Sequence, residues 1–210
     1  MIRVLIADDH PIVRQGLQQI LGDTPEMRVV GEATNGQEAL DMVRAEAWDV
    51  VVLDISMPDH SGLDILKQLT SERPGLPVLV LSMYSEDQFA MRVLKAGARG
   101  YLTKESAPEE LVKAIRKVVS GGTYVSACLA EKLAFDIGAD SSKLPHEALS
   151  DREFQVLRLI AAGKSVKEIA AELSLSVKTV STYRARLLEK MNLETNAELI
   201  HYAIQNHLID

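Results

Sequence analysis

Acidic, hydroxyl and amino side chains recur in the first half of this sequence, at the points where short apolar runs end. The pair Asp8-Asp9 follows VLIA, Asp54 follows VVVL, Ser82 follows VLVL, and Lys104 comes directly after GYLT. Carboxylate oxygens are the ligands that Mg²⁺ prefers, and an ammonium group beside them neutralises charge on a transferring phosphoryl group. These residue types therefore suit a divalent cation and a phosphoryl group.

The carboxylates point to a specific reaction. Neighbouring carboxylates oppose joint ionisation unless a cation compensates them, so we expect Asp8, Asp9 and Asp54 to hold Mg²⁺. Asp54 is the candidate nucleophile on phosphorus, because it ends the third apolar run, near the middle of the predicted sheet. Lys104 and Mg²⁺ would neutralise the transferring group. The alternative is structural, with Asp8-Asp9 capping the next helix and Asp54 capping a turn.

The first 120 residues alternate between apolar runs and amphipathic stretches, which indicates βαβ units and a parallel sheet. The predicted strands are Arg3–Ala7, Arg28–Ala33, Val50–Leu53, Val78–Leu81 and Gly100–Leu102. The predicted helices are Ile12–Leu21, Gln37–Ala45, Gly62–Thr70, Asp87–Ala96 and Glu109–Val119. Capping boxes are expected at Ser61…Asp64 and Ser106…Glu109. In such a sheet functional groups collect at the carboxyl ends of the strands, so the polar residues should meet at one edge.

Residues 121–147 differ from the regions on either side. Gly121-Gly122 ends the last helix of the first half, Ser126–Phe135 predicts a short helix, and GADSSKLPHE indicates a linker. We therefore predict a first domain at 1–120, a linker at 121–147 and a second domain at 148–210.

The second domain shows helical patterns and no strand patterns. Capping boxes at Ser150…Glu153, Ser165…Glu168 and Thr195…Glu198 open three helices, and Ser176 caps a fourth that begins near Val177. The segments SVKEIAAELSLS and VKTVSTYRARLLEKMNL predict a helix-turn-helix, whose second helix can enter the DNA major groove.

The basic charge of this domain is concentrated on that second helix. Residues 177–190 hold Lys178, Arg184, Arg186 and Lys190 against Glu189, whereas residues 144–210 as a whole are nearly balanced. Lysine and arginine contacts to phosphates would supply affinity, and contacts to base edges would supply sequence choice. The alternative is the solvated face of a protein-interaction bundle.

The amino-acid composition restricts the class of protein and its expected location. Of the 210 residues 47% are hydrophobic and the formal net charge is −7, which favours a folded chain that does not coat nucleic acid indiscriminately. Cys128 is the single cysteine, so no intrachain disulfide is available. No stretch has the length of a membrane span and the start lacks a signal-peptide pattern. We expect a cytoplasmic protein without a membrane partner.

Long, ordered segments carry a family resemblance. LIADDHPIVRQGL, VVLDISMPDHSGLDIL, VLVLSMY and KAGARGYLTKES resemble the receiver domain of bacterial two-component response regulators. The resemblance implies a flavodoxin-like, five-stranded parallel sheet in which Asp54 accepts phosphate from a sensor histidine kinase. It places Asp8, Asp9, Asp54 and the backbone carbonyl of Ser56 at a Mg²⁺ site. It also implies that Lys104 contacts the phosphoryl oxygens while Ser82 moves toward the phosphoryl group and Tyr101 rotates inward.

The second half carries its own resemblance. LSDREFQVLRLIAAGKSVKEIAAELSLSVKTVSTYRARLLEKMNL is similar to the LuxR-type helix-turn-helix of the NarL/FixJ response regulators, in which the third of four helices reads double-stranded DNA. Carried over by position, the base-facing residues are Ser181, Thr182 and Ala185. The candidates for the DNA backbone are Lys178, Thr179, Tyr183, Arg184 and Arg186. Leu199, Tyr202 and Ala203 of the last helix would form either a small symmetric interface or ordinary core packing.

We therefore interpret the chain as a DNA-binding transcription regulator controlled by phosphorylation of Asp54. It would act as a homodimer when phosphorylated, with RNA polymerase as a further partner. It would not be an enzyme beyond assisting its own phosphorylation and dephosphorylation. One rival is an Asp-dependent phosphohydrolase, which Ile55-Ser56 after Asp54 argues against, since that class generally has a second Asp two residues on. Another rival is a regulator that dimerises constitutively.

Overall fold

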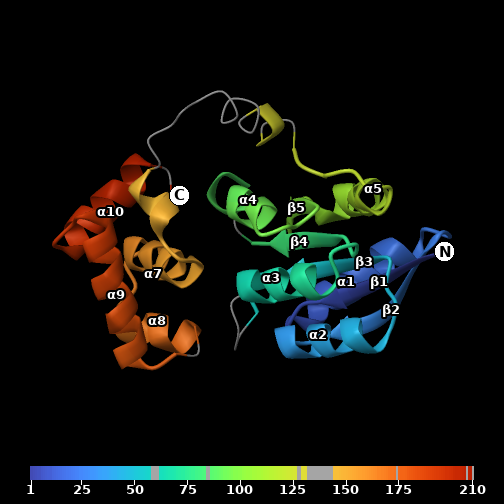
Figure 1. Ribbon diagram of the computed structural model, residues 1–210, viewed down its shortest axis with the longest axis horizontal. Coiled ribbons are helices and arrows are strands. Elements are labelled where there is room, and N and C mark those ends of the chain that lie inside the picture. The colour runs from blue at the N-terminus through green and yellow to red at the C-terminus, as the bar shows by residue number, and fades with distance from the viewer. Residues whose placement is uncertain are drawn as a thin grey trace. The chain divides into compact units, whose positions relative to one another are not determined.

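The computed structural model describes residues 1–57, 62–83, 86–126, 129–131, 144–173, 175–206 and 208–209. Its contacts divide the chain into two compact units, Met1–Ile137 and Gly138–Asp210, and each is described by itself (Figure 1). Cys128, Ser61 and most of the predicted helix Ser126–Phe135 lie outside the described residues.

The first unit is a parallel sheet covered by helices on both faces. Its strands are β1 (Ile2–Ala7), β2 (Met27–Ala33), β3 (Val50–Asp54), β4 (Val78–Ser82) and β5 (Gly100–Thr103). They lie in the order β2-β1-β3-β4-β5, and every neighbouring pair is parallel. This arrangement confirms the predicted α/β fold with a five-stranded parallel sheet.

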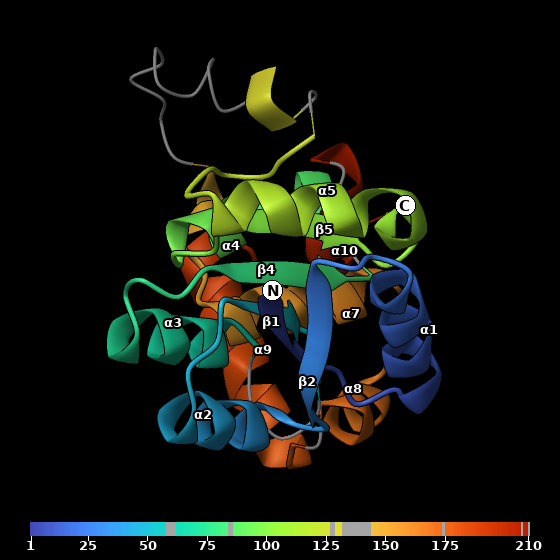
Figure 2. The same ribbon diagram turned by 90° about the vertical axis from the view of Figure 1, so that its right-hand side faces the viewer.

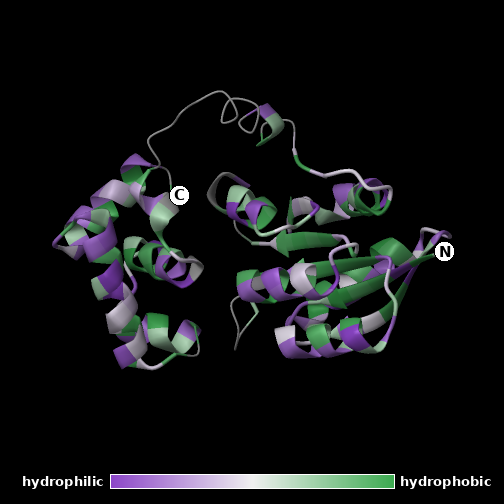
Figure 3. Ribbon diagram, in the orientation of Figure 1, coloured by the Kyte–Doolittle hydropathy of each residue, from purple (hydrophilic) through white to green (hydrophobic). Residues whose placement is uncertain are grey.

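The helices of this unit are α1 (Pro11–Gly22), α2 (Gly36–Ala45), α3 (Gly62–Glu72), α4 (Glu86–Lys95) and α5 (Ala107–Val119). Figure 2 shows α1 and α5 over one face of the sheet and α2, α3 and α4 over the other. Both faces of the central strands are therefore covered, which explains why β3 and β4 are buried at every position and are apolar except for their last residues. The apolar strands and mixed helices are visible in Figure 3.

One predicted helix cap is wrong. Ser106 precedes α5, but its side chain makes no capping hydrogen bond to the helix. Its hydroxyl instead donates to the carbonyl of Thr103 at 3.1 Å, and its backbone is helical rather than extended. A capping side chain requires an extended backbone at the cap residue, so the turn that connects β5 to α5 excludes the predicted capping box.

The first residues of the predicted linker contact the first unit. Tyr124 forms a parallel β-bridge with Gly100 of β5, and its N–H donates to the carbonyl of Arg99 at 2.8 Å. The hydroxyl of Ser126 then bonds the carboxylate of Glu86, the first residue of α4. The first residues of the predicted linker therefore run beside the edge strand β5, parallel to it, and belong to this unit.

The second unit consists of helices. A 3₁₀ turn η1 (Pro145–Ala148) precedes α7 (Asp151–Ala161), α8 (Val166–Glu172), α9 (Val177–Met191) and α10 (Asn196–Gln205). The predicted capping boxes at Ser150, Ser165 and Thr195 are all present, and Ser176 caps α9. The core is formed by apolar residues from all four helices, including Phe154, Leu157, Ile169, Val180, Leu187 and Leu199. Within the described part of the chain, no helix is long and apolar enough to cross a membrane.

Candidate functional site

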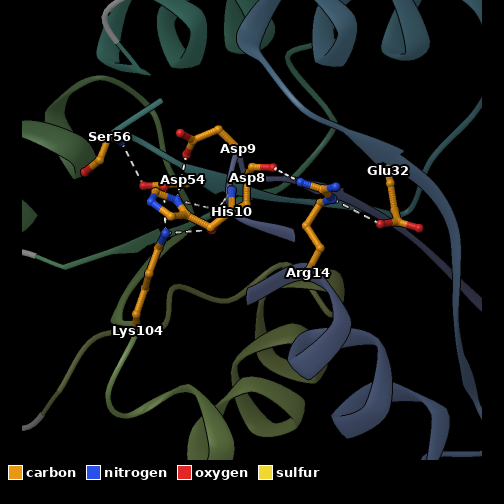
Figure 4. A network of polar contacts seen from close by, with 8 residues as sticks. All are labelled: Asp8, Asp9, His10, Arg14, Glu32, Asp54, Ser56 and Lys104. Atoms are coloured by element: carbon orange, nitrogen blue, oxygen red, sulfur yellow. Dashed lines mark hydrogen bonds and ion pairs between the residues drawn. The ribbon is translucent and has the colours of Figure 1, made fainter. Parts of the chain in front are cut away.

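The predicted polar residues meet at the carboxyl edge of the sheet in the first unit. Asp8 directly follows β1 and Asp54 ends β3, which pairs with β1, so the topology brings their carboxylates together. Both residues are about 1% exposed, whereas the Asp9 side chain is 26% exposed. Figure 4 shows the carboxylates of Asp8 and Asp54 in contact with Lys104, and that of Asp9 beside His10.

Lys104 compensates the buried acidic charge. Its Nζ donates a 2.7 Å hydrogen bond to Asp54 Oδ2 and also lies 2.7 Å from Asp8 Oδ2, although only the Asp54 contact has the angle of a hydrogen bond. Burial alone would lower the pKa of Lys104, but Asp54 and Asp8 outweigh it and hold the pKa above its ordinary value. Lys104 is therefore a cation that holds two strand ends together.

The environment of Asp54 favours its neutral form more than water does. Burial raises the pKa of Asp54, and the nearby charge of Asp8 raises it further. Lys104 and the backbone N–H of Ser56, which donates to Asp54 Oδ1 at 2.8 Å, oppose this shift without cancelling it. A second cation in the pocket would therefore favour the carboxylate.

The donor atoms fit a hard divalent cation. Asp8, Asp9, His10 and Asp54 each place one ligand atom so that all four atoms lie within 4.8 Å of one another. Among the described side chains, Asp8 Oδ2 and Asp9 Oδ1 are buried oxygens that accept no hydrogen bond. Oxygen-rich sites of this kind suit Mg²⁺, so the three carboxylates rather than the imidazole would hold it.

Two further residues belong to this site, His10 and Arg14, neither of which was predicted from the sequence. The Nδ1 of His10 lies 2.8 Å from Asp9 Oδ1 and 3.2 Å from Asp8 Oδ1. Arg14 of α1 donates from Nη1 to the backbone carbonyl of Asp8 at 2.8 Å. The place of His10 directly after the Asp pair is a signal that was available in the sequence, whereas nothing in the sequence separates Arg14 from surface arginines.

Ser82 lies on β4, the strand next to Asp54, and Tyr101 lies one strand further on, on β5. Ser82 ends β4 and is buried, and its carbonyl accepts the N–H of Lys104 at 2.7 Å. Tyr101 of β5 is also fully buried, more deeply than a half-buried surface aromatic would be, and it pairs with Val80 of β4. Ser82 is thus linked through the backbone to the lysine of the pocket.

The predicted DNA-binding residues lie along α9 in the second unit. Lys178, Ser181, Thr182, Ala185 and Arg186 are exposed, and Thr179, Tyr183 and Arg184 are partly exposed. The Ser181 and Thr182 hydroxyls donate to backbone carbonyls one turn earlier in the helix, and Arg184 donates to Asn196 Oδ1 at 2.6 Å. The exposed cations of this group are therefore Lys178 and Arg186.

Lys190, predicted on the same basic helix, has a structural partner. Its Nζ donates a 2.7 Å hydrogen bond to Glu153 Oε2, and Glu153 is 3% exposed. Burial would raise the pKa of Glu153, but Lys190 and the Ser150 cap outweigh it and hold the pKa below its ordinary value. Lys190 thus joins the end of α9 to the start of α7.

Residues of the last helix, α10, were predicted to form either a symmetric interface or ordinary core packing. Leu199 and Ala203 are fully buried, so they belong to the core and not to an exposed interface. The Tyr202 hydroxyl hydrogen-bonds His146 Nδ1 at 2.8 Å, which fastens η1 to α10. Ile204 is the large apolar residue that this helix exposes.

Comparison with known families agrees with the two units. Residues 4–116 match the response regulator receiver domain, and residues 147–203 match the bacterial regulatory proteins of the luxR family. The chain is a response regulator of the NarL/FixJ family. This response regulator is accordingly a DNA-binding transcription regulator controlled by phosphorylation, and the rival phosphohydrolase interpretation is wrong.

Curated relatives and solved structures extend over nearly its whole length. The response regulator UvrY of Escherichia coli K12 is 40% identical over 209 residues, which cover 99% of this chain and 96% of UvrY. The response regulator GacA of Pseudomonas protegens is 40% identical over 210 residues, which cover 100% of this chain and 99% of GacA. The Salmonella typhimurium RcsB response regulator has a TM-score of 0.72 at 29% identity, and covers 98% of each chain.

A further RcsB structure includes a promoter. RcsB from Salmonella enterica serovar Typhimurium, bound to promoter rprA in the presence of the phosphomimetic BeF₃⁻, has a TM-score of 0.66 at 31% identity and covers 96% of this response regulator and 97% of RcsB.

Proposed function

We propose that Asp54 is the phosphoacceptor and that its phosphorylation by a sensor histidine kinase controls sequence-specific binding of α9 to double-stranded DNA. The observation that carries the proposal is the contact of Lys104 Nζ, 2.7 Å from both Asp54 Oδ2 and Asp8 Oδ2, in a pocket with two buried oxygens that accept no hydrogen bond. A buried pocket with this donor set suits a phosphoryl group and a cation.

The residues have separable roles in the proposed transfer. A carboxylate oxygen of Asp54 attacks phosphorus, and the bond from phosphorus to the leaving nitrogen of the kinase histidine breaks as the new bond forms. The N–H of Ser56 holds Asp54 Oδ1 and thereby orients the carboxylate. Lys104 then compensates charge on the phosphoryl oxygens.

Mg²⁺ would be held by Asp8, Asp9, Asp54 and the backbone carbonyl of Ser56. When bound, it supplies positive charge that neutralises the phosphoryl oxygens. The carboxylates of Asp8 and Asp54 are both buried and share one lysine, so a metal-free pocket keeps more negative than positive charge.

We propose that Ser82 and Tyr101 transmit the effect of phosphorylation from the pocket to the surface of the first unit. Ser82 would move toward the phosphoryl group, and Tyr101, which is already buried, would be retained in its inward position. Because Lys104 N–H bonds the Ser82 carbonyl, a change at one of these residues affects the other. The outcome would be a changed surface over α4 and β5.

In the second unit we propose that Ser181, Thr182 and Ala185 face base edges. The proposed contacts to the DNA backbone are Lys178, Thr179, Tyr183, Arg184 and Arg186. Lys178 and Arg186 are exposed on α9 and suit phosphate. Arg184 would have to leave or share Asn196, its present partner.

We propose a three-part division into 1–120, 121–147 and 148–210, with the linker docked at both ends through Tyr124 and His146. The working form would be a cytoplasmic homodimer when phosphorylated, whose two recognition helices fit half-sites about one DNA turn apart. RNA polymerase would be a partner at the promoter.

The proposal is tested by operator affinity with and without a small phosphoryl donor and Mg²⁺. Phosphorylation is expected to raise the affinity of the intact chain, and Asp54→Asn is expected to abolish that increase. Equal affinities at confirmed Asp54 phosphorylation would contradict the proposal and would favour constitutive dimerisation.

A further inference from the structure

The backbone of Asp8 is held from both sides. Its N–H donates to the carbonyl of Ala33 on β2 at 3.1 Å, and its own carbonyl accepts Nη1 of Arg14 at 2.8 Å. The Asp8 side chain is fixed in addition, because Oδ1 accepts the N–H of His10 at 2.8 Å. The residue that precedes Asp9 is therefore bound on its backbone and on its side chain.

Arg14 is itself held in place by a second layer of contacts. Its Nε donates to Glu32 Oε2 at 3.1 Å, and Gln18 Nε2 donates to the other oxygen of Glu32 at 2.5 Å. The Arg14 side chain is 13% exposed. Figure 4 shows the guanidinium between Glu32 of β2 and the Asp8 backbone. One helix and one strand thus determine where the guanidinium lies.

The hydrogen bond to Asp8 has a consequence for Asp9. A peptide unit is planar, so the carbonyl of Asp8 and the amide nitrogen of Asp9 share one plane. Arg14 therefore restricts the rotation of the peptide that carries Asp9. The Asp9 carboxylate contributes Oδ1, one of the two buried oxygens that accept no hydrogen bond.

Charge is not the main contribution of this arginine. Glu32 already pairs with the guanidinium, so the two side chains together add little net charge to the pocket. What the arginine provides is a fixed fork of donors that serves two acceptors at once.

We infer that Arg14 is a positioning residue, which holds the Asp8–Asp9 peptide in the orientation that brings both carboxylates to the Mg²⁺ site. The inference rests on the proposed function, because it assigns Arg14 a task in that same pocket. Partners that orient metal ligands typically contribute about 10- to 100-fold to metal affinity or activity.

The test is a titration of the full chain with Mg²⁺ alone, followed by amide chemical shifts. Arg14→Met is expected to weaken Mg²⁺ binding about tenfold, and Arg14→Lys is expected to recover part of that loss. At saturating Mg²⁺ the rate of phosphorylation by a small donor should return to within about twofold of wild type. A general loss of structure would not produce this split between metal affinity and rate.

Matched variants distinguish a positioning role of Arg14 from an effect of its charge. Arg116→Met removes another arginine of the same unit, which pairs with Glu26 on the exposed surface, and it should leave Mg²⁺ binding unchanged. Glu32→Gln keeps an acceptor oxygen for Arg14 Nε and should bind Mg²⁺ nearly as wild type does. If charge were decisive, Glu32→Gln would weaken binding, because the guanidinium would lose its counter-ion.

The outcomes are distinguishable. Mg²⁺ affinity of Arg14→Met within about twofold of wild type would overturn the role of Arg14 and leave the proposed function intact. If Arg14→Met does not fold, Arg14→Lys and Glu32→Ala replace it, and unchanged Mg²⁺ affinity in both would overturn the inference. A wild-type chain that binds no Mg²⁺ would overturn the proposed function and the role of Arg14 with it.

Discussion

Lys104, in the turn after β5, donates a 2.7 Å hydrogen bond to Asp54, the last residue of β3. The same ammonium lies 2.7 Å from Asp8, so a single cation serves carboxylates that follow two neighbouring strands. The Lys104 side chain is 8% exposed and Asp54 is buried. The pair therefore has both a structural and a chemical function.

Removal of this cation should destabilise the metal-free protein. Lys104→Met leaves Asp8 and Asp54 buried without it, and breaking a buried pair in this way typically costs about 3–5 kcal/mol. We expect thermal unfolding to show a large loss of stability that Mg²⁺ partly restores. Lys113→Met, at an exposed position on α5, is the control and should change stability by less than about 0.5 kcal/mol. Equal stabilities of the two variants would contradict this account.

The raised pKa of Asp54 gives a pH dependence with a definite sign. Burial is its main cause, and no second cation offsets it in metal-free buffer. The sign is therefore expressed in the folding stability of the metal-free protein. The folded state binds this proton more tightly than the unfolded state, so stability should rise as pH falls through the window above about 3.9, the ordinary carboxyl value.

Comparison with Asp54→Asn isolates this contribution. The melting temperatures of the two proteins are measured across the acidic range in metal-free buffer. The melting temperature of wild type should rise relative to that of Asp54→Asn as pH falls, because only wild type takes up the proton. A difference that stays constant with pH would show that burial does not shift this carboxyl.

Asp9→Asn should have opposite effects on the metal-free and metal-bound states. It removes one of three mutually repelling carboxylates, so the metal-free protein should become more stable, by about 0.5–1 kcal/mol. It also removes a Mg²⁺ ligand, so metal affinity should fall about tenfold or more. Asp23→Asn, at an exposed position after α1, is the matched control. Lower thermal stability of Asp9→Asn in metal-free buffer would contradict the proposed repulsion.

Arg186 of α9 should contribute to DNA binding mainly through phosphate. Arg186→Ala is expected to weaken specific and non-specific binding alike, and to reduce the slope of log affinity against log salt by about one. Lys164→Ala, in the same unit, removes a cation that already pairs with Glu172 and should leave the slope unchanged. An identical slope for Arg186→Ala and wild type, measured by fluorescence anisotropy, would remove Arg186 from the interface.

Lys190 should act on stability more than on DNA affinity. Lys190→Met leaves the buried Glu153 without its cation, and the loss of such a charged hydrogen bond typically costs about 1.5–3 kcal/mol. Because Lys190 is 42% exposed, we expect a value at or below the lower end of that range. A double-mutant cycle with Glu153→Gln, followed by unfolding of the second unit, measures the coupling, and a coupling near zero would contradict a structural role.

The strands and most helix caps were predicted well because the signals that determine them lie within short stretches of sequence. Apolar runs gave the strands, and the capping boxes at Ser150, Ser165 and Thr195 depend only on neighbouring residues. Ser106 has the same spacing but fails, because Thr103 of the preceding strand takes its hydroxyl. The sequence signal was identical, and the competing partner came from the turn geometry.

The pocket was predictable to the extent that strand ends define it. Asp8, Asp54 and Lys104 follow from the rule that polar residues gather at the carboxyl edge of a parallel sheet. Arg14 could not be found in this way, because its partner is a backbone carbonyl and its orientation depends on Glu32 of another strand. The placement of Lys190 beside Glu153 likewise required the packing of α9 on α7.

The most direct test combines chemical and binding readouts on one sample. Wild type and Asp54→Asn are treated with a small phosphoryl donor and Mg²⁺, mapped by mass spectrometry, and titrated with operator DNA. We predict one phosphoryl group at Asp54, tighter DNA binding by wild type alone, and neither effect when Mg²⁺ is removed by chelation. A phosphoryl group mapped to another residue, or an equal gain in DNA affinity by Asp54→Asn, would contradict the account.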